Sequence, residues 1–217
     1  MKNMIVVLLL CFSFSALNAQ NPVTLKSAGD KALAAKQYAV ALTNYEKALA
    51  VWGKKPIDNA MIYTMGTCAY SANDMKKSLK YFDMSIAAGY NLDMAYQYRA
   101  CVMQAQKDSD GYLQTLKDGL VKVPNSKALK GSLSKVYDTE GDKHYHLALD
   151  ILKNAVAQVN AGKITSADKA FKAENERARR ELNEAIKWLN MSLELTPNDE
   201  NTKKAKGNCQ TQLQMLI

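Results

Sequence analysis

Few residues in the sequence could do chemistry, and two histidines are the first to consider. His144 and His146 are the only histidines and lie in the segment DKHYHLALD. Residues two positions apart on a helix point about 200° apart, so these side chains cannot chelate one ion as an i,i+4 pair would. The segment predicts the solvated start of a helix, and we expect no metal site and no cofactor.

Three cysteines follow the leader-like N-terminal segment: Cys68, Cys101 and Cys209. An odd number does not indicate a disulfide framework. Cys68 and Cys101 could be bridged if they meet on neighbouring helices, but we favour buried thiols that behave as small apolar residues. Cys101 has no histidine or activating charge near it in the sequence, so we do not interpret it as a nucleophile.

Motifs of catalytic sites are also missing from the sequence. There is no Gly-rich loop ending in Lys and Ser/Thr, no GxSxG and no HExxH. We therefore predict no catalytic residues and a protein that is not an enzyme. An enzyme whose site has an unfamiliar composition is the weaker alternative.

A repeated helical pattern predicts the elements that position the remaining candidate residues. In YAVALTNYEKALAVWG (38–53), Ala41, Tyr45 and Ala48 share one helix face because they are spaced by four and three. Related triples recur with first members 34 to 37 residues apart, and the residue after each first and last member is aliphatic. The further triples are Ser78/Phe82/Ser85, Tyr112/Leu116/Gly119, Ala148/Leu152/Ala155 and Ala185/Leu189/Ser192.

A second amphipathic segment precedes the first four triples, and turn-prone residues separate the two segments. These residues are SAND (71–74), KDSDG (107–111) and TEGD (139–142). The pattern predicts helix–turn–helix units over about 23–56, 57–92, 93–125 and 126–160. Small residues at the facing positions would let the two helices of each unit approach closely.

These residues resemble the tetratricopeptide repeat, a helix-pair unit of about 34 residues. The resemblance rests on Gly29, Gly66 and Ala100 in the first helices, on the triples of the second helices, and on Pro124 and Pro197 after them. It covers residues 23–197. It implies an all-α fold, a right-handed superhelical solenoid whose concave surface binds peptides or proteins.

The C-terminal part departs from this pattern. Residues 166–195 contain no Gly or Pro, which predicts a long helix over 165–195. Ala205, Cys209, Leu213 and Leu216 then form one apolar stripe, which predicts a capping helix over 199–216. The apolar stripe near Ala185–Leu195 is a candidate homodimer surface.

The face beside the packing residues of each first helix is the candidate partner-binding groove. Its members are Lys26, Asp30, Tyr63, Thr67, Tyr70, Gln97, Cys101, Gln104, Lys135 and Asp138. Tyr63 and Tyr70 are the candidate anchors, because tyrosine offers a large contact area and a hydroxyl group; packing between helices is the alternative. Some tetratricopeptide-repeat proteins hold a partner's C-terminal carboxylate with Lys and Asn, but Asp30 stands where that Asn would be and would repel a carboxylate.

The N-terminus predicts export. Lys2, the apolar run of residues 4–14 and the small residues before Gln20 have the layout of a signal peptide over 1–19, and the run is too short for a stable transmembrane segment. Lipoprotein anchoring through Cys11 is disfavoured because LLL precedes it. The net charge of +8 is scattered over the chain, which predicts a solvated surface; an acidic partner or an anionic membrane is the alternative.

Together these features predict a periplasmic or secreted, noncatalytic scaffold or adaptor of the bacterial cell envelope. We expect residues 20–217 to form the repeat domain and to bind a protein or peptide. An exported protein has little access to nucleic acid, so we expect no nucleic-acid partner. The alternative is a carbohydrate-binding or surface-nutrient-uptake accessory protein on the same helices.

Overall fold

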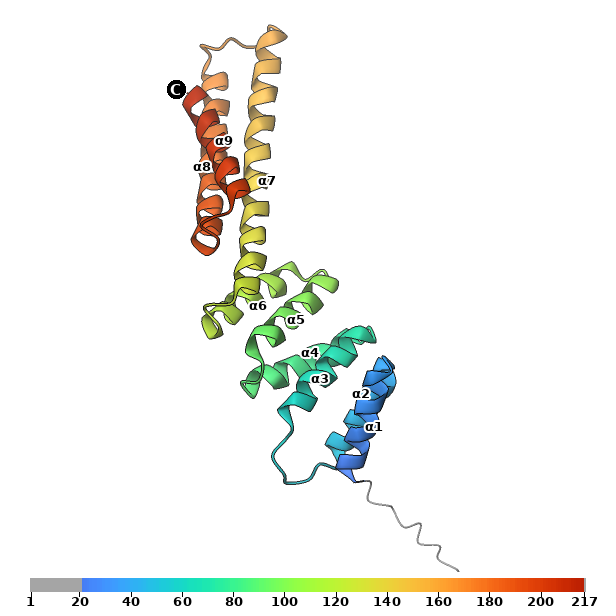
Figure 1. The fold of residues 1–217 in the computed structure, drawn as a ribbon. Coiled ribbons are helices and arrows are strands. Elements are labelled where there is room, and N and C mark those ends of the chain that lie inside the picture. Colours follow the sequence, from blue (N-terminus) through green and yellow to red (C-terminus); the bar gives the residue numbers. More distant parts are fainter. Residues whose placement is uncertain (1–20, 217) are drawn as a thin grey trace, which may run out of the picture.

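The computed structural model describes residues 21–216. The predicted signal peptide, residues 1–19, lies outside the described residues. The described residues form nine α-helices and no strand (Figure 1). This confirms the prediction of an all-α helical-repeat solenoid. The helices are α1 (Pro22–Ala34), α2 (Tyr38–Ala50), α3 (Asn59–Ser71), α4 (Met75–Ala87), α5 (Leu92–Ala105), α6 (Ser109–Lys122), α7 (Lys127–Asn160), α8 (Lys169–Leu195) and α9 (Glu200–Met215).

The first six helices form three hairpins, and a glycine sets the close contact in two of them. A Cβ atom added to Gly29 of α1 would lie 2.6 Å from the Tyr45 ring of α2. A Cβ atom added to Gly66 of α3 would lie 2.8 Å from the Phe82 ring of α4. Both rings are buried. The aromatic members of the triples therefore fill the space that the glycines leave free.

The turns inside these hairpins share one geometry. Lys36, Asn73 and Lys107 have positive φ angles of 56°, 62° and 59°, and each is followed by the N-cap residue of the second helix. Asp74 and Asp108 cap α4 and α6 by accepting the amide protons of Lys77 and Gly111. Such caps satisfy amide groups that would otherwise lack a partner.

The predicted turn at 139–142 is wrong, because α7 runs through these residues as a single 34-residue helix. Gly141 serves a close contact here and not a turn. A Cβ atom on it would lie 2.9 Å from Leu189 Cγ and 3.3 Å from the Ala185 carbonyl oxygen, both in α8. The interpretation of TEGD failed because glycine is used for turns and for close helix contacts alike.

The fourth helix pair consists of α7 and α8, which run side by side, with α9 beside them (Figure 1). The triple Ala148/Leu152/Ala155 therefore lies in the first helix of this pair and not in a second helix of its own, as predicted. The stripe proposed for a homodimer, Ala185, Leu189 and Ser192, is buried within the chain. Ala205, Cys209 and Leu213 of α9, and Leu216 directly after it, belong to the same apolar cluster.

The hairpins stack so that the first helices of successive hairpins lie next to one another. Contacts join α3 to α5 and α5 to α7, in addition to those within each hairpin. The predicted groove residues all lie on the first helices, which are α1, α3, α5 and α7. Among residues 21–216, no helix combines the length and the apolar character needed to cross a membrane.

Candidate functional site

The groove residues of α1 are engaged with each other. Lys26 Nζ lies 3.1 Å from Asp30 Oδ2 and 3.8 Å from Asp58 Oδ2. The Tyr45 hydroxyl donates a hydrogen bond to Asp30 Oδ1 over 2.8 Å. Asp30 thus provides a hydrogen-bond acceptor for the hydroxyl of the buried Tyr45. Burial and this hydrogen bond to the carboxylate raise the pKa of Tyr45. Lys26 and Asp30 together present little unbalanced charge to a ligand.

The groove residues of α3 belong to an aromatic cluster. The Tyr63 ring lies 5.9 Å from Phe82, 6.2 Å from Tyr90 and 6.3 Å from Tyr98, measured between ring centroids. Tyr70 contacts Tyr98 at 5.8 Å in an edge-to-face arrangement. Burial raises the pKa of Tyr63, and the neighbouring Tyr98 and Tyr90 add to the shift. The tyrosines therefore pack between α3 and α5, while both keep part of their surface exposed.

Thr67 makes no cross-helix hydrogen bond in the part of the chain described here. Its hydroxyl donates to the Thr64 carbonyl oxygen within α3, over 2.9 Å. This local bond leaves the exposed part of Thr67 as a neutral surface beside the tyrosines.

Four of the predicted residues come together between α5 and α7. Gln97, Cys101, Gln104 and Lys135 line a hollow of about 280 Å³ together with Ala100, Tyr112, Leu116 and Ser132. A second hollow of about 260 Å³ adjoins it and shares Gln104 and Tyr112 with it. The second hollow is completed by Lys107, Ser109, Val136, Thr139, Glu140 and Lys143. We call the two hollows together the α5–α7 trough.

The trough has an apolar floor and a polar rim. Ala100 and Leu116 are buried at 2% and 1% exposure, whereas Cys101, Gln104 and Lys135 are exposed. Gln97 donates a hydrogen bond to Asp93 over 2.8 Å, which fixes its amide against α5. Amide groups beside an apolar floor can pair with the backbone of an extended peptide while the floor takes one of its side chains.

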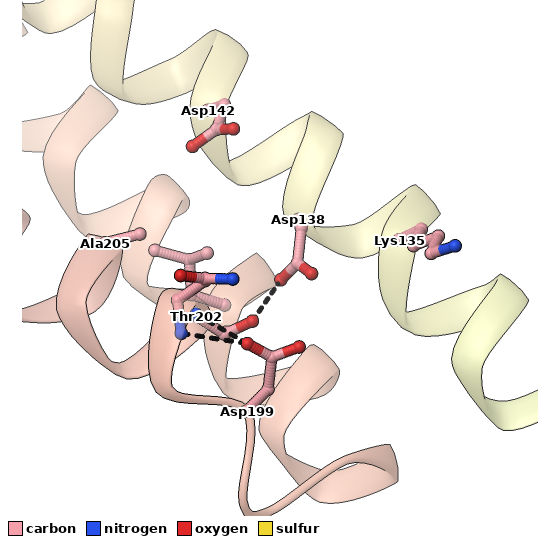
Figure 2. Close-up of a pocket in the computed structure, with 8 residues that line it drawn as sticks. Lys135, Asp138, Asp142, Asp199, Thr202 and Ala205 are labelled. Atoms are coloured by element: carbon pink, nitrogen blue, oxygen red, sulfur yellow. Dashed lines mark hydrogen bonds between the residues drawn. The ribbon is translucent and has the colours of Figure 1, made fainter. Parts of the chain in front are cut away.

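Lys135 also lines a third hollow on the other side of α7, and Asp138 lies there (Figure 2). This α7–α9 hollow has a volume of about 270 Å³. The Thr202 hydroxyl donates to Asp138 over 3.0 Å, and Asp199 accepts the amide protons of Asn201 and Thr202 at the start of α9. Asp138 therefore attaches α9 to α7.

The three cysteines within the described residues are unbridged, and His144 contacts α8. Cys68, Cys101 and Cys209 are all unbridged; Cys68 and Cys209 are buried, whereas Cys101 is exposed, against the expectation of a buried thiol. His144 lies in the middle of α7, not at a helix start, and its Nδ1 lies 2.7 Å from Glu181 Oε2 of α8. Within residues 21–216, no group of three or more His, Cys, Asp or Glu side chains is placed to hold a metal ion.

Tyr98, Tyr112, Ser132 and Lys107 are among the residues of this surface that were missed in the sequence. Tyr98 stacks on Phe82 with centroids 5.3 Å apart and planes 7° apart. Tyr112 could have been found, because it is the large first member of its triple where the other triples have Ala or Ser. Ser132 carries no such signal, because its position depends on how α7 passes α5.

Comparison with known proteins supports the fold assignment. No protein-family model matches the sequence, and no curated protein matches it significantly. A TPR repeats protein from Bacteroides fragilis NCTC 9343 has a similar structure, with 23% identity and a TM-score of 0.64 over 88% of this chain and 99% of the other.

Two further solved structures resemble the chain more distantly. A protein from Bacteroides ovatus ATCC 8483 shares 11% identity over 91% of this chain and 100% of its own, with a TM-score of 0.46. The yeast Sti1 TPR2AB-domain:pHSP90-complex shares 16% identity over 88% and 84%, with a TM-score of 0.36. The assignment rests on the Bacteroides fragilis structure: the chain has the tetratricopeptide-repeat fold.

Proposed function

We propose that the protein is a noncatalytic scaffold that binds a protein or peptide partner in the α5–α7 trough. The observation that carries this proposal is the convergence of Gln97, Cys101, Gln104 and Lys135 on one hollow. Concave surfaces of stacked helix pairs are suited to extended peptides. The trough offers amide and hydroxyl groups around an apolar floor, which suits a peptide backbone and one inserted side chain.

We further propose that the protein acts in the bacterial cell envelope, as a periplasmic or secreted protein. The support is the sequence of residues 1–19, with a lysine, an apolar run and small residues before Gln20. An N-terminal sequence determined on protein purified from the producing cells tests this. A mature chain beginning at Gln20 is expected, and a chain that retains residues 1–19 would contradict export with cleavage.

A carbohydrate ligand is the second candidate, and the aromatic cluster is where it would bind. Sugar rings stack on the free faces of aromatic side chains. Here the Tyr98 face is stacked on Phe82, and Tyr63 and Tyr70 meet Tyr98 at 72° and 69°. The rings therefore pack against one another, which favours the peptide proposal over the glycan alternative.

Affinity capture with paired variants tests the peptide proposal. Tagged residues 20–217 are exposed to envelope extract of the producing bacterium, beside Gln97→Ala/Gln104→Ala in the trough. The matched control is Gln158→Ala/Gln210→Ala, which removes two exposed amides on α7 and α9 away from the trough. We expect a protein retained by the wild type and the control and lost from the trough variant. Equal retention by all three would place the partner elsewhere.

A further inference from the structure

We infer that the α5–α7 trough recognises an acidic, internal segment of an extended polypeptide. The inference rests on the proposed function and adds the chemistry of the ligand. It is carried by the charges of the trough and by its extent over two adjoining hollows.

The trough has an excess of positive charge. Lys135 lines the first hollow, which has no carboxylate in its lining, and Lys107 and Lys143 line the second beside Glu140. Glu140 lies 2.5 Å from Lys143 Nζ, so that these two charges largely offset each other. No carboxylate within residues 21–216 forms an ion pair with Lys107 or Lys135. The two lysines therefore leave positive potential for an acidic ligand.

The opposite charge on the other side of α7 limits where acidic side chains can lie. Asp138, Asp142 and Asp199 line the α7–α9 hollow (Figure 2). Lys135 lines both this hollow and the trough. Carboxylates of a ligand would be repelled there and attracted on the α5 side. The acidic residues of the bound segment thus lie on the α5 side of Lys135 and at the α5–α6 turn, which carries Lys107.

The extent of the trough indicates an internal segment and not a chain end. Lys135 and Lys107 belong to different hollows, so two acidic side chains along one extended segment are needed to meet both. The buried floor of Ala100 and Leu116 lies in the first hollow beside Lys135 and takes an apolar side chain. A free C-terminal carboxylate is not required by this arrangement.

A random dodecapeptide library fused at its C-terminal end to a phage coat protein tests the inference on residues 20–217. Selected peptides are then synthesised with an amidated C-terminus, and their affinities are measured. We expect acidic residues around an apolar one, and binding about threefold to tenfold weaker to Lys107→Ala/Lys135→Ala. Lys153→Ala/Lys172→Ala, which removes two exposed lysines on α7 and α8, is the matched control and should bind normally.

Two other outcomes separate this inference from the proposed function. Peptides without an acidic excess that bind Lys107→Ala/Lys135→Ala normally, but fail on Gln97→Ala/Gln104→Ala, would overturn the acidic ligand and leave the trough as a binding site. Peptides that bind all variants equally would overturn both. A fused library that yields no binders, where a library displayed with free C-termini does yield them, would overturn the internal segment.

Discussion

The hairpins α1–α2 and α3–α4 and the long pair α7–α8 make the same glycine contact at different sequence distances. Tyr45 follows Gly29 by 16 residues, and Phe82 follows Gly66 by the same interval. Gly141 instead meets Leu189, which is 48 residues away. The packing rule is therefore unchanged, while the helices that carry it are extended in α7 and α8. The predictions below test whether the two regions obey this one rule.

Truncation of the buried middle residue of a triple should have the largest effect in both regions. Leu116 of α6 and Leu189 of α8 are each 1% exposed, so Leu116→Ala and Leu189→Ala should each lower the free energy of unfolding by about 2–5 kcal/mol. Leu152→Ala should cost less, because Leu152 is only partly buried in α7. Urea unfolding measures the three values. Equal losses for Leu152 and Leu189 would contradict the assignment of Leu189 as the buried partner.

Two glycines of α7 should respond to alanine in opposite directions. Gly141→Ala should cost about 1–3 kcal/mol, because the new Cβ would lie 2.9 Å from Leu189 Cγ. Gly131→Ala should stabilise by about 0.5–1 kcal/mol, because no atom outside the adjoining backbone of α7 and the two neighbouring residues lies within 4 Å of its Cβ position, and alanine favours the helix. Thermal unfolding followed by circular dichroism compares them. A stabilising Gly141→Ala would show that α7 and α8 do not approach here as described.

The two groove tyrosines should differ in their cost to stability. Tyr63 contacts three rings and Tyr70 contacts one, and an aromatic pair contributes about 0.5–1.5 kcal/mol. Tyr63→Leu should therefore destabilise more than Tyr70→Leu in urea unfolding, with helical circular dichroism kept in both. Equal effects would mean that Tyr63 packs no more extensively than Tyr70.

The first hairpin lacks a cap that the next two possess. Gln37 precedes α2 without a side-chain hydrogen bond, whereas Asp74 and Asp108 cap the corresponding helices. Gln37→Asp should raise the free energy of unfolding by about 0.5–1 kcal/mol, because it would satisfy a free amide group. The reverse change, Asp74→Gln, serves as the control and should destabilise. No gain from Gln37→Asp would indicate that the turn at Lys36 does not place residue 37 in the position that the turn at Asn73 gives residue 74.

The three thiols should differ in reactivity. Burial raises the pKa of Cys68 and of Cys209 to about 11 from an ordinary value of 9.0. Their protonated forms are favoured in the fold, so this contribution to stability is present below about pH 9 and lost as the pH rises toward 11. At neutral pH, a thiol reagent should modify Cys101 first. Cys101→Ser should abolish the fast phase, and a fast phase that persists would contradict the burial of the other two.

The sequence predicted those contacts that lie within one hairpin. The triples around Tyr45, Phe82 and Leu116 and the turns before Met75 and Ser109 follow from short-range spacing, because each hairpin closes within a few tens of residues. The pairing of Gly141 with Leu189 could not be predicted this way. The spacing of Ala148, Leu152 and Ala155 is that expected of a second helix, although these residues lie in α7, the first helix of its pair.

The same limit applies to the candidate site. The faces of α3 and α5 were predicted from helical periodicity, which places Gln97, Cys101 and Gln104 together. The convergence of Lys135 with them, and the separation of Asp138 into the α7–α9 hollow, depend on how α7 passes between two neighbours. The pairing of Lys26 with Asp30 depends on side-chain geometry, which the one-turn spacing allows but does not require.

Photo-crosslinking from Cys101 tests most directly whether the α5–α7 trough binds a partner. Cys101 is exposed in the trough, so a thiol-reactive benzophenone places a short probe there. Val121→Cys in a Cys101→Ser background places the same probe on α6, where Val121 is 77% exposed and lines none of the three hollows. With envelope extract we predict crosslinks to a protein partner from Cys101 and none from position 121. Crosslinks from position 121 alone would contradict the account.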